Sequence, residues 1–218
     1  MKLSTAIARF IITFSIVAGI ALSPVWASEN TGHDESIGKV TRIQKSAIAI
    51  QDAMSRALMI GTDIFRGDII STGKGARVEV RLKDNSTFTL GERTHFVVEE
   101  FLAGDTDNNI VLRMIQGAFI ATSGELLKTA NASMVIETPT ATIGIRGTTA
   151  WGGDINGKFS IALMSGKSII VENKNGSVVI DTPGFGTIVN SKNNAPTTPK
   201  IWSKSKINKA HNITGFSN

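Results

Sequence analysis

The chain has 218 residues, with 23 lysine or arginine residues, 18 aspartate or glutamate residues and no cysteine. The lack of cysteine excludes disulfides, thiol catalysis and thiolate metal sites, so stability must come from buried apolar surface. The formal net charge of +5 lies at the two ends, because residues 28–181 hold 16 basic and 18 acidic side chains. The basic isoelectric point therefore does not indicate a nucleic-acid-binding face on the central region.

The first 27 residues have the pattern of a secretory signal peptide. Lys2 and Arg9 supply positive charge, and residues 10–22 form an apolar run that Thr13 and Ser15 interrupt. Val25 and Ala27 are small residues of the kind that a signal peptidase reads. This apolar run is shorter than the roughly 20 residues that a membrane helix needs, although an uncleaved N-terminal anchor is the alternative.

We therefore expect a mature protein that begins at Ser28, has an N-terminal lead over residues 28–37, and is periplasmic or secreted. No later segment is long and apolar enough to predict a membrane span, so we expect none in the mature chain.

Residues 38–190 are predicted to form a domain of short strands, because apolar and polar residues alternate with a period of two. The expected strands are 77–82, 87–90, 110–115, 118–121, 134–136, 159–163, 168–171, 177–180 and 187–189. The expected turns between them are 83–86, 152–157, 165–167 and 173–176, and Asn175-Gly176 is a two-residue hairpin signal. The fold class predicted is all-β, with stacked short antiparallel strands in a β-sandwich, a β-roll or a solenoid-like stack.

Helical signals are weak. Residues 52–58 could form two turns at most, and residues 124–128 one turn. Residues 191–218 contain two prolines, five lysines and scattered asparagine and serine, so we expect a basic, flexible tail, with Trp202 as a residue that could dock it. This tail could weakly touch anionic surfaces.

The segment from Glu137 to Thr148 has the composition of a positioned turn between strands. Pro139 lacks a backbone donor and belongs at a strand start or edge, while Gly144 and Gly147 permit backbone conformations that a side chain would obstruct. No nucleophile has a base beside it here, so the segment is predicted to be architectural.

Three stretches resemble the FecR-like domain family, the exported sensing part of ferric-citrate-type anti-sigma regulators. The first contains Gly67, Asp68, Thr72 and Gly73; the second is 76–90; and the third contains Thr138, Pro139, Gly144, Arg146, Gly147 and Thr148. The resemblance covers about residues 38–190. Asn85 stands where the family has glycine, and asparagine tolerates a left-handed turn.

The resemblance also has a departure. Regulators of this family place a cytoplasmic anti-sigma segment and a transmembrane helix before the exported domain and carry an extra C-terminal module, whereas here we expect a signal peptide in the place of the first two and no such module. The resemblance therefore implies the exported domain without the anti-sigma activity.

Arg146 has two possible roles. Its guanidinium could clamp a carboxylate or phosphate, or it could be buried and pair with Glu137, Glu99 or Asp68 to tie strand turns together. We expect the second. The histidines, His33, His95 and His211, are far apart, and residues 105–109 lack the glycine and glutamate of a calcium loop, so we expect no catalytic residue, metal or cofactor.

The function predicted is an exported, non-enzymatic binding module of the bacterial envelope, in signalling or surface assembly. Its partner would be an envelope protein or ligand and not nucleic acid. The alternative is a self-associating structural scaffold of the envelope or the cell surface.

Overall fold

The computed structural model describes residues 35–103, 108–124 and 132–217. The chain divides into two units, residues 1–33 and 34–218, and the description below concerns the second. The predicted signal peptide and most of the lead lie outside the described residues, so both remain predictions. Among the described residues, no helix is long and apolar enough to cross a membrane.

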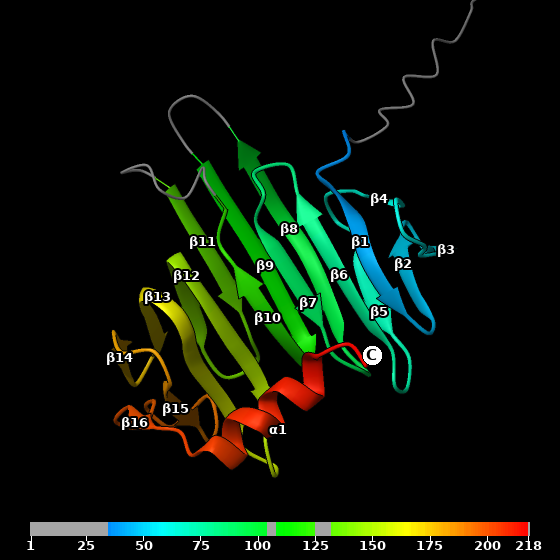
Figure 1. Cartoon of the computed structure of the whole chain (residues 1–218). Helices are drawn as coiled ribbons and strands as arrows, with labels where there is room; N and C mark the ends of the chain where they lie inside the picture. The colour runs from blue at the N-terminus through cyan, green and yellow to red at the C-terminus, as the bar shows by residue number, and fades with distance from the viewer. Residues whose placement is uncertain (1–34, 104–107, 125–131, 218) are drawn as a thin grey trace, which may run out of the picture. The chain divides into compact units, whose positions relative to one another are not determined.

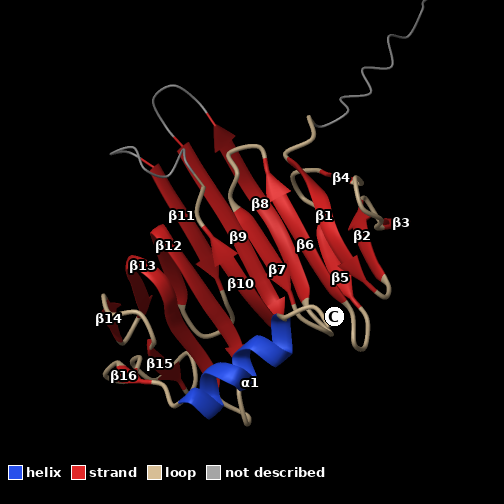
Figure 2. Ribbon diagram, in the orientation of Figure 1, coloured by secondary structure: helices blue, strands red, loops and turns tan. Residues whose placement is uncertain are grey.

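The described residues form strands almost throughout (Figures 1 and 2). The strands are β1 (Gly38–Gln44), β2 (Ala47–Gln51), β3 (Met54–Ala57), β4 (Asp63–Ile64), β5 (Ile69–Thr72), β6 (Arg77–Leu82), β7 (Thr87–Leu90), β8 (His95–Ala103), β9 (Asn108–Gln116), β10 (Ala118–Thr122), β11 (Ala132–Glu137), β12 (Thr142–Asp154), β13 (Phe159–Asn173), β14 (Gly176–Ile180), β15 (Phe185–Val189) and β16 (Lys200–Ile201), and the helix is α1 (Lys204–Thr214).

All sixteen strands of the described chain belong to one sheet. Its main path runs β3-β2-β5-β8-β9-β11-β12-β10-β7-β6-β1-β4 and curls into a half-barrel, while β13 pairs with β12 and carries β14 and β15. Within the described chain, β9 and β11 form the one parallel pair; the other pairs are antiparallel. The all-β prediction is confirmed, and the strands are arranged as one rolled sheet.

The main hydrophobic core covers the inner face of this sheet, because alternate residues of each strand point to the same side. In β7 and β10, Phe88 and Phe119 are fully buried, and Phe96 of β8 lies between them with ring centroids 5.2 Å and 5.9 Å away. Aromatic pairs at such separations add attraction beyond their buried area.

A second, smaller core lies on the outer face of β10, β12 and β13. Ala118, Trp151 and Ala162 each follow or precede a residue of the main core in their strand, so they point to the outer face. There they are buried under the C-terminal segment. Trp202 packs edge-to-face on Trp151 with centroids 5.7 Å apart, and the indole N–H of Trp151 donates to the carbonyl oxygen of Ala210 at 3.1 Å.

This docking corrects the prediction of a flexible tail, and it confirms Trp202 as a residue that docks the segment on the domain. Residues 200–214 contain β16 and α1 (Figure 1), and Ser203 caps the helix by accepting a hydrogen bond from the backbone N–H of Lys206. The apolar side of α1, with Ile207, Ala210 and Ile213, packs on the second core. The composition is that of a tail, but a short helix is stabilised mainly by the surface on which it packs.

Two local predictions are also corrected. Residues 52–58 contain a tight turn and β3 instead of a helix, because Asp52 and Ala53 both have positive φ and join β2 to β3. The predicted turn at 165–167 lies inside the continuous strand β13, where Gly166 has φ of +100°. Most of the possible turn of helix at 124–128 lies outside the described residues.

The predicted hairpin near Asn175 is present, with Asn173 paired to Gly176 at the ends of β13 and β14.

Candidate functional site

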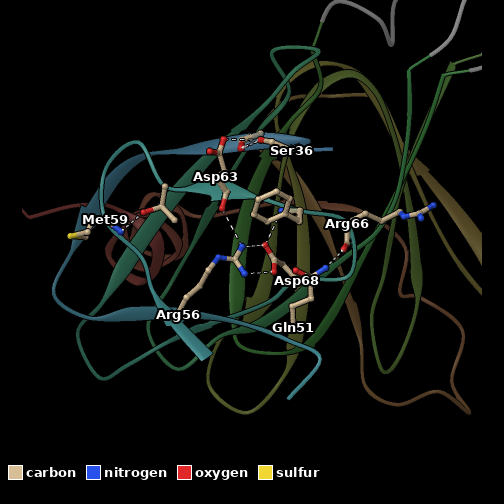
Figure 3. A network of polar contacts seen from close by, with 10 residues as sticks. Ser36, Gln51, Arg56, Met59, Asp63, Arg66 and Asp68 are labelled. Carbon is tan, nitrogen blue, oxygen red and sulfur yellow. Dashed lines mark hydrogen bonds and ion pairs between the residues drawn. The ribbon is translucent and has the colours of Figure 1, made fainter. Parts of the chain in front are cut away.

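The first signature stretch forms a buried ion pair beneath the turn before β5 (Figure 3). The Asp68 carboxylate is completely buried and binds both terminal nitrogens of Arg56 from β3, one of them at 2.8 Å. It also accepts a hydrogen bond from the backbone N–H of Phe65 at 2.8 Å, while Gly67 makes the turn with φ of +84°. Asp68 thus ties the β4–β5 turn to the strand at the end of the sheet.

Arg56 has further partners in this network. Its Nη2 donates to the backbone carbonyl of Asp63 at 3.1 Å, and its guanidinium lies 5.0 Å from the centroid of the Phe65 ring. Such a planar cation can bind a carboxylate through two bonds and also stack on an aromatic face. Both terminal nitrogens of Arg56 are therefore paired, whereas its buried Nε has no hydrogen-bond partner among the described residues.

Thr72 and Gly73, at the end of the same stretch, bond to the β5–β6 turn and to the β7–β8 connection. The buried Thr72 hydroxyl donates to the carbonyl oxygen of Gly91 at 2.6 Å and accepts from the N–H of Thr94 at 2.9 Å. The carbonyl oxygen of Gly73 accepts from the N–H of Ala76 at 3.1 Å. These bonds link the end of β5 to the β7–β8 connection.

The second stretch forms the β6–β7 turn. Asn85 has φ of +65°, so the expectation that it replaces glycine in a left-handed turn is confirmed. The Asp84 carboxylate accepts bonds from the backbone N–H and the hydroxyl of Ser86, and the Ser86 hydroxyl accepts from the N–H of Gly124 at 2.7 Å.

The third stretch begins as the turn between β11 and β12. The Thr138 hydroxyl donates to the carbonyl oxygen of Ala141 at 2.7 Å and accepts from the N–H of Ala141 at 3.0 Å, which closes the turn around the exposed Pro139. A threonine hydroxyl that bonds a neighbouring backbone segment in this way specifies a turn.

The rest of the stretch is the point where β12 changes neighbours. Residues 142–145 pair with β11, whereas residues 149–153 pair with β10. Between these segments Gly147 has φ of +64°, and the backbone of Thr148 exchanges bonds with Ser123 at 3.0 Å and 3.1 Å. Opposite, an added Cβ on Gly166 would lie 2.5 Å from the carbonyl oxygen of Gly147. The glycines let the two long strands bend together.

Residues 68–168 match the family model described as FecR protein. These residues are a FecR domain. All three signature stretches contribute to it, and they hold turns and a strand bend in place. FecR domains occur in anti-sigma regulators, where they typically lie on the periplasmic side.

The fold is shared with two crystal structures, at 1.65 Å and 2.50 Å resolution, of a proposed anti-sigma factor from Parabacteroides distasonis. Each has 15% sequence identity, a TM-score of 0.51, and a match over 64% of this chain and 62% of the other. The chain thus spans less than two thirds of those structures, and at this identity the likeness concerns the fold. A search of proteins with curated functions found no significant match.

Arg146 of the FecR domain lies elsewhere than predicted. It is exposed on the outer face of β12, so the expectation of a buried guanidinium is wrong. Of the acids proposed as its partners, Glu99 and Glu137 both bind Arg113 at 3.0 Å, and Asp68 binds Arg56. Gly144 has no positive φ in the structure, and its role is considered with the outer face below.

The described part of the FecR domain and its C-terminal segment holds no group of three metal-ligating side chains. His95 lies in β8 and His211 on the exposed side of α1, and His33 and residues 105–107 fall outside the description.

An apolar row on the outer face leads across the FecR domain to a free strand edge. Hydrogen-bonded neighbours place Val111, Val135, Gly144, Ile170 and Val179 opposite one another in β9, β11, β12, β13 and β14. Ile170 is 47% exposed and Val179 58% exposed, and Gly144 adds no side chain between them and the other valines. The neighbouring outward positions are polar, so the row is a narrow apolar strip.

β14 has one strand neighbour in the described chain, β13, so its other edge is not paired with a strand. Sequence reasoning did not find this surface. Its one local signal was the run of β-branched residues in 177–180, which puts apolar side chains on both faces of the strand.

Proposed function

We propose that this chain is an exported, non-enzymatic module of the bacterial envelope that binds an extended segment of a partner protein along β14. The observation that carries the proposal is the apolar row that ends at the unpaired edge of β14. An edge strand offers a row of backbone donors and acceptors, and side chains on the exposed face then select the added strand.

The dimensions suit a short added strand. β14 has five residues, Gly176–Ile180, and its outward Val179 lies beside Ile170 of β13. An added strand would continue the apolar row by placing a β-branched or aromatic residue next to Val179, because cross-strand pairs of this kind are favourable. A partner segment of about five residues with alternating apolar side chains is the occupant that fits.

The non-enzymatic part of the proposal is supported by how the signature residues are used. Four polar residues of the three stretches, Asp68, Thr72, Asp84 and Thr138, form hydrogen bonds to backbone groups, to Arg56 and to the Ser86 hydroxyl. Groups held in this way specify the fold. Export is supported by the signal-peptide pattern of the first 27 residues.

Site-specific photo-crosslinking in the source bacterium tests the partner proposal. A photoreactive amino acid at position 179 should give an adduct with one other envelope protein, and the same group at Arg81, exposed on β6, should not. Combining the position-179 probe with Ile170→Thr, which keeps the β-branch but removes apolar surface, should weaken that adduct. No adduct at position 179, or the same adducts at both positions, would refute the proposal.

The second candidate function is self-association through the same edge. The β14 strands of two copies could pair antiparallel about a two-fold axis, since a self-complementary edge gives a closed dimer. In that case the position-179 adduct would contain two copies of this chain, and analytical ultracentrifugation would detect a dimer that Val179→Asp makes monomeric.

A further inference from the structure

A basic hollow lies between the start of α1 and the loop that joins β12 to β13. Its volume is about 340 Å³, and its polar lining includes Lys158, Ser160, Ser203, Ser205, Lys206 and Lys209. Ile155 and Ile188 form its apolar walls, and no acidic side chain is among the residues that line it. It lies apart from β14 and from the signature stretches, so it is independent of the function proposed above.

The three lysines of this hollow are not neutralised by ion pairs in the described chain. Lys209 donates to the side-chain oxygen of Asn156 at 2.7 Å, and the Lys206 ammonium lies 4.1 Å from the centroid of the Trp202 ring. These contacts hold the amino groups in place but leave their charge uncompensated. Burial, and then the nearby charge of Lys158, lower the pKa of Lys206.

The charge arrangement is unfavourable for the protein alone. The first turn of α1 has no acidic residue and contains Lys204 and Lys206, although the start of a helix favours negative charge. Like charges gathered around a hollow repel one another, and an anion within it would remove that repulsion. The arrangement is thus one that a bound anion would stabilise.

We propose that this hollow binds an anion of the phosphate class, as a phosphoryl or diphosphoryl group. Lysines act as point charges toward phosphate, and the hydroxyls of Ser203 and Ser205 add short polar groups around a tetrahedral anion. A planar carboxylate is better matched by the fork of an arginine, and no arginine lines the hollow. The phosphate could belong to a soluble molecule or to a lipid head group.

Calorimetric titration of the protein isolated from the envelope tests this site. The probes are sodium phosphate, pyrophosphate and the dicarboxylate malonate, and sedimentation with vesicles compares phosphatidylglycerol–phosphatidylcholine mixtures with phosphatidylcholine alone. We expect pyrophosphate to bind, and Lys158→Gln to weaken it about tenfold. The matched control Lys167→Gln removes the same charge from an exposed site on β13 and should change affinity less than about twofold.

The results separate the two sources of phosphate. Pyrophosphate binding that depends on Lys158 indicates a soluble phosphoryl ligand, and binding only to phosphatidylglycerol vesicles with the same dependence indicates a lipid head group. The proposal is overturned if no probe binds, if malonate binds more tightly than pyrophosphate, or if both variants lose affinity equally. Because Lys158 is exposed, Lys158→Gln should unfold at the same temperature as the wild type, which shows that a loss of binding is not a loss of fold.

Discussion

Replacing Asp68 by alanine should remove a large part of the stability of the domain. The Asp68 side chain is 0% exposed, and it accepts two bonds from Arg56 and one from the backbone N–H of Phe65. Removing one partner of a buried pair costs about 3–5 kcal/mol, because the other charge is left uncompensated. The Arg56 side chain is 31% exposed and can be partly hydrated, so we expect the lower value, about 3 kcal/mol.

Urea unfolding followed by far-ultraviolet circular dichroism measures this loss. In a domain of this size a change of about 3 kcal/mol should lower Tm by roughly 6–12 °C. Asp68→Asn keeps an acceptor for the N–H of Phe65, so it should cost less than Asp68→Ala. Truncating both partners, in Asp68→Ala with Arg56→Ala, should cost less than the sum of the single changes, because neither charge is then stranded.

Arg146→Ala is the control variant with which the loss of stability in Asp68→Ala is compared. Arg146 was the arginine expected from sequence to form the buried pair, but it is exposed in β12, so its truncation should cost less than about 1 kcal/mol. An Asp68→Ala variant that unfolds at the wild-type urea midpoint, or an Arg146→Ala variant that is less stable than Asp68→Ala, would refute this assignment of the buried charge.

Three further predictions concern the strand bend, the C-terminal segment and pH. Gly166→Ala should prevent stable folding, measured as loss of the cooperative urea transition, because its φ is +100° and its Cβ would lie 2.5 Å from the carbonyl oxygen of Gly147. Trp202→Ala should cost about 3–5 kcal/mol in thermal unfolding, because it removes the buried indole that packs the C-terminal segment on Trp151. The backbone N–H of Gly75 holds the pKa of Glu92 below its usual value, so this carboxylate stabilises the fold above its unfolded pKa, and the contribution is lost as pH falls through the lower folded pKa. Glu92→Gln should therefore reduce the dependence of Tm on pH in that acidic range, and an unchanged pH profile would contradict this assignment.

The strands and their inner faces could be predicted from local sequence. Residues 77–82 and 87–90 form β6 and β7 with the predicted bounds, because strict alternation allows one set of side chains to be buried. The left-handed turn at Asn85 followed from the family resemblance, in which glycine stands at this position, and from the tolerance of asparagine for such a turn. Such features depend on neighbours a few residues apart, so they are present in the sequence.

The C-terminal segment shows where local reasoning was insufficient. Its lysines, prolines and asparagines are typical of a tail, yet Trp202 and Ala210 are buried on the outer face of the sheet. Trp151 provides that surface about fifty residues earlier in the chain. The composition of the C-terminal segment therefore cannot predict that it packs on Trp151.

Alternation and turn residues, read from the sequence by themselves, determined that this protein is all-β and where most of its strands lie. Only the tertiary structure decided which charges meet. Asp68 pairs with Arg56 because β3 returns beside the β4–β5 turn, while β12 presents Arg146 on its outer face. The same holds for the basic hollow, whose lysines come from the β12–β13 loop and from α1. Charge pairs and binding sites join residues that are distant in sequence, and their distances depend on how the whole sheet curls.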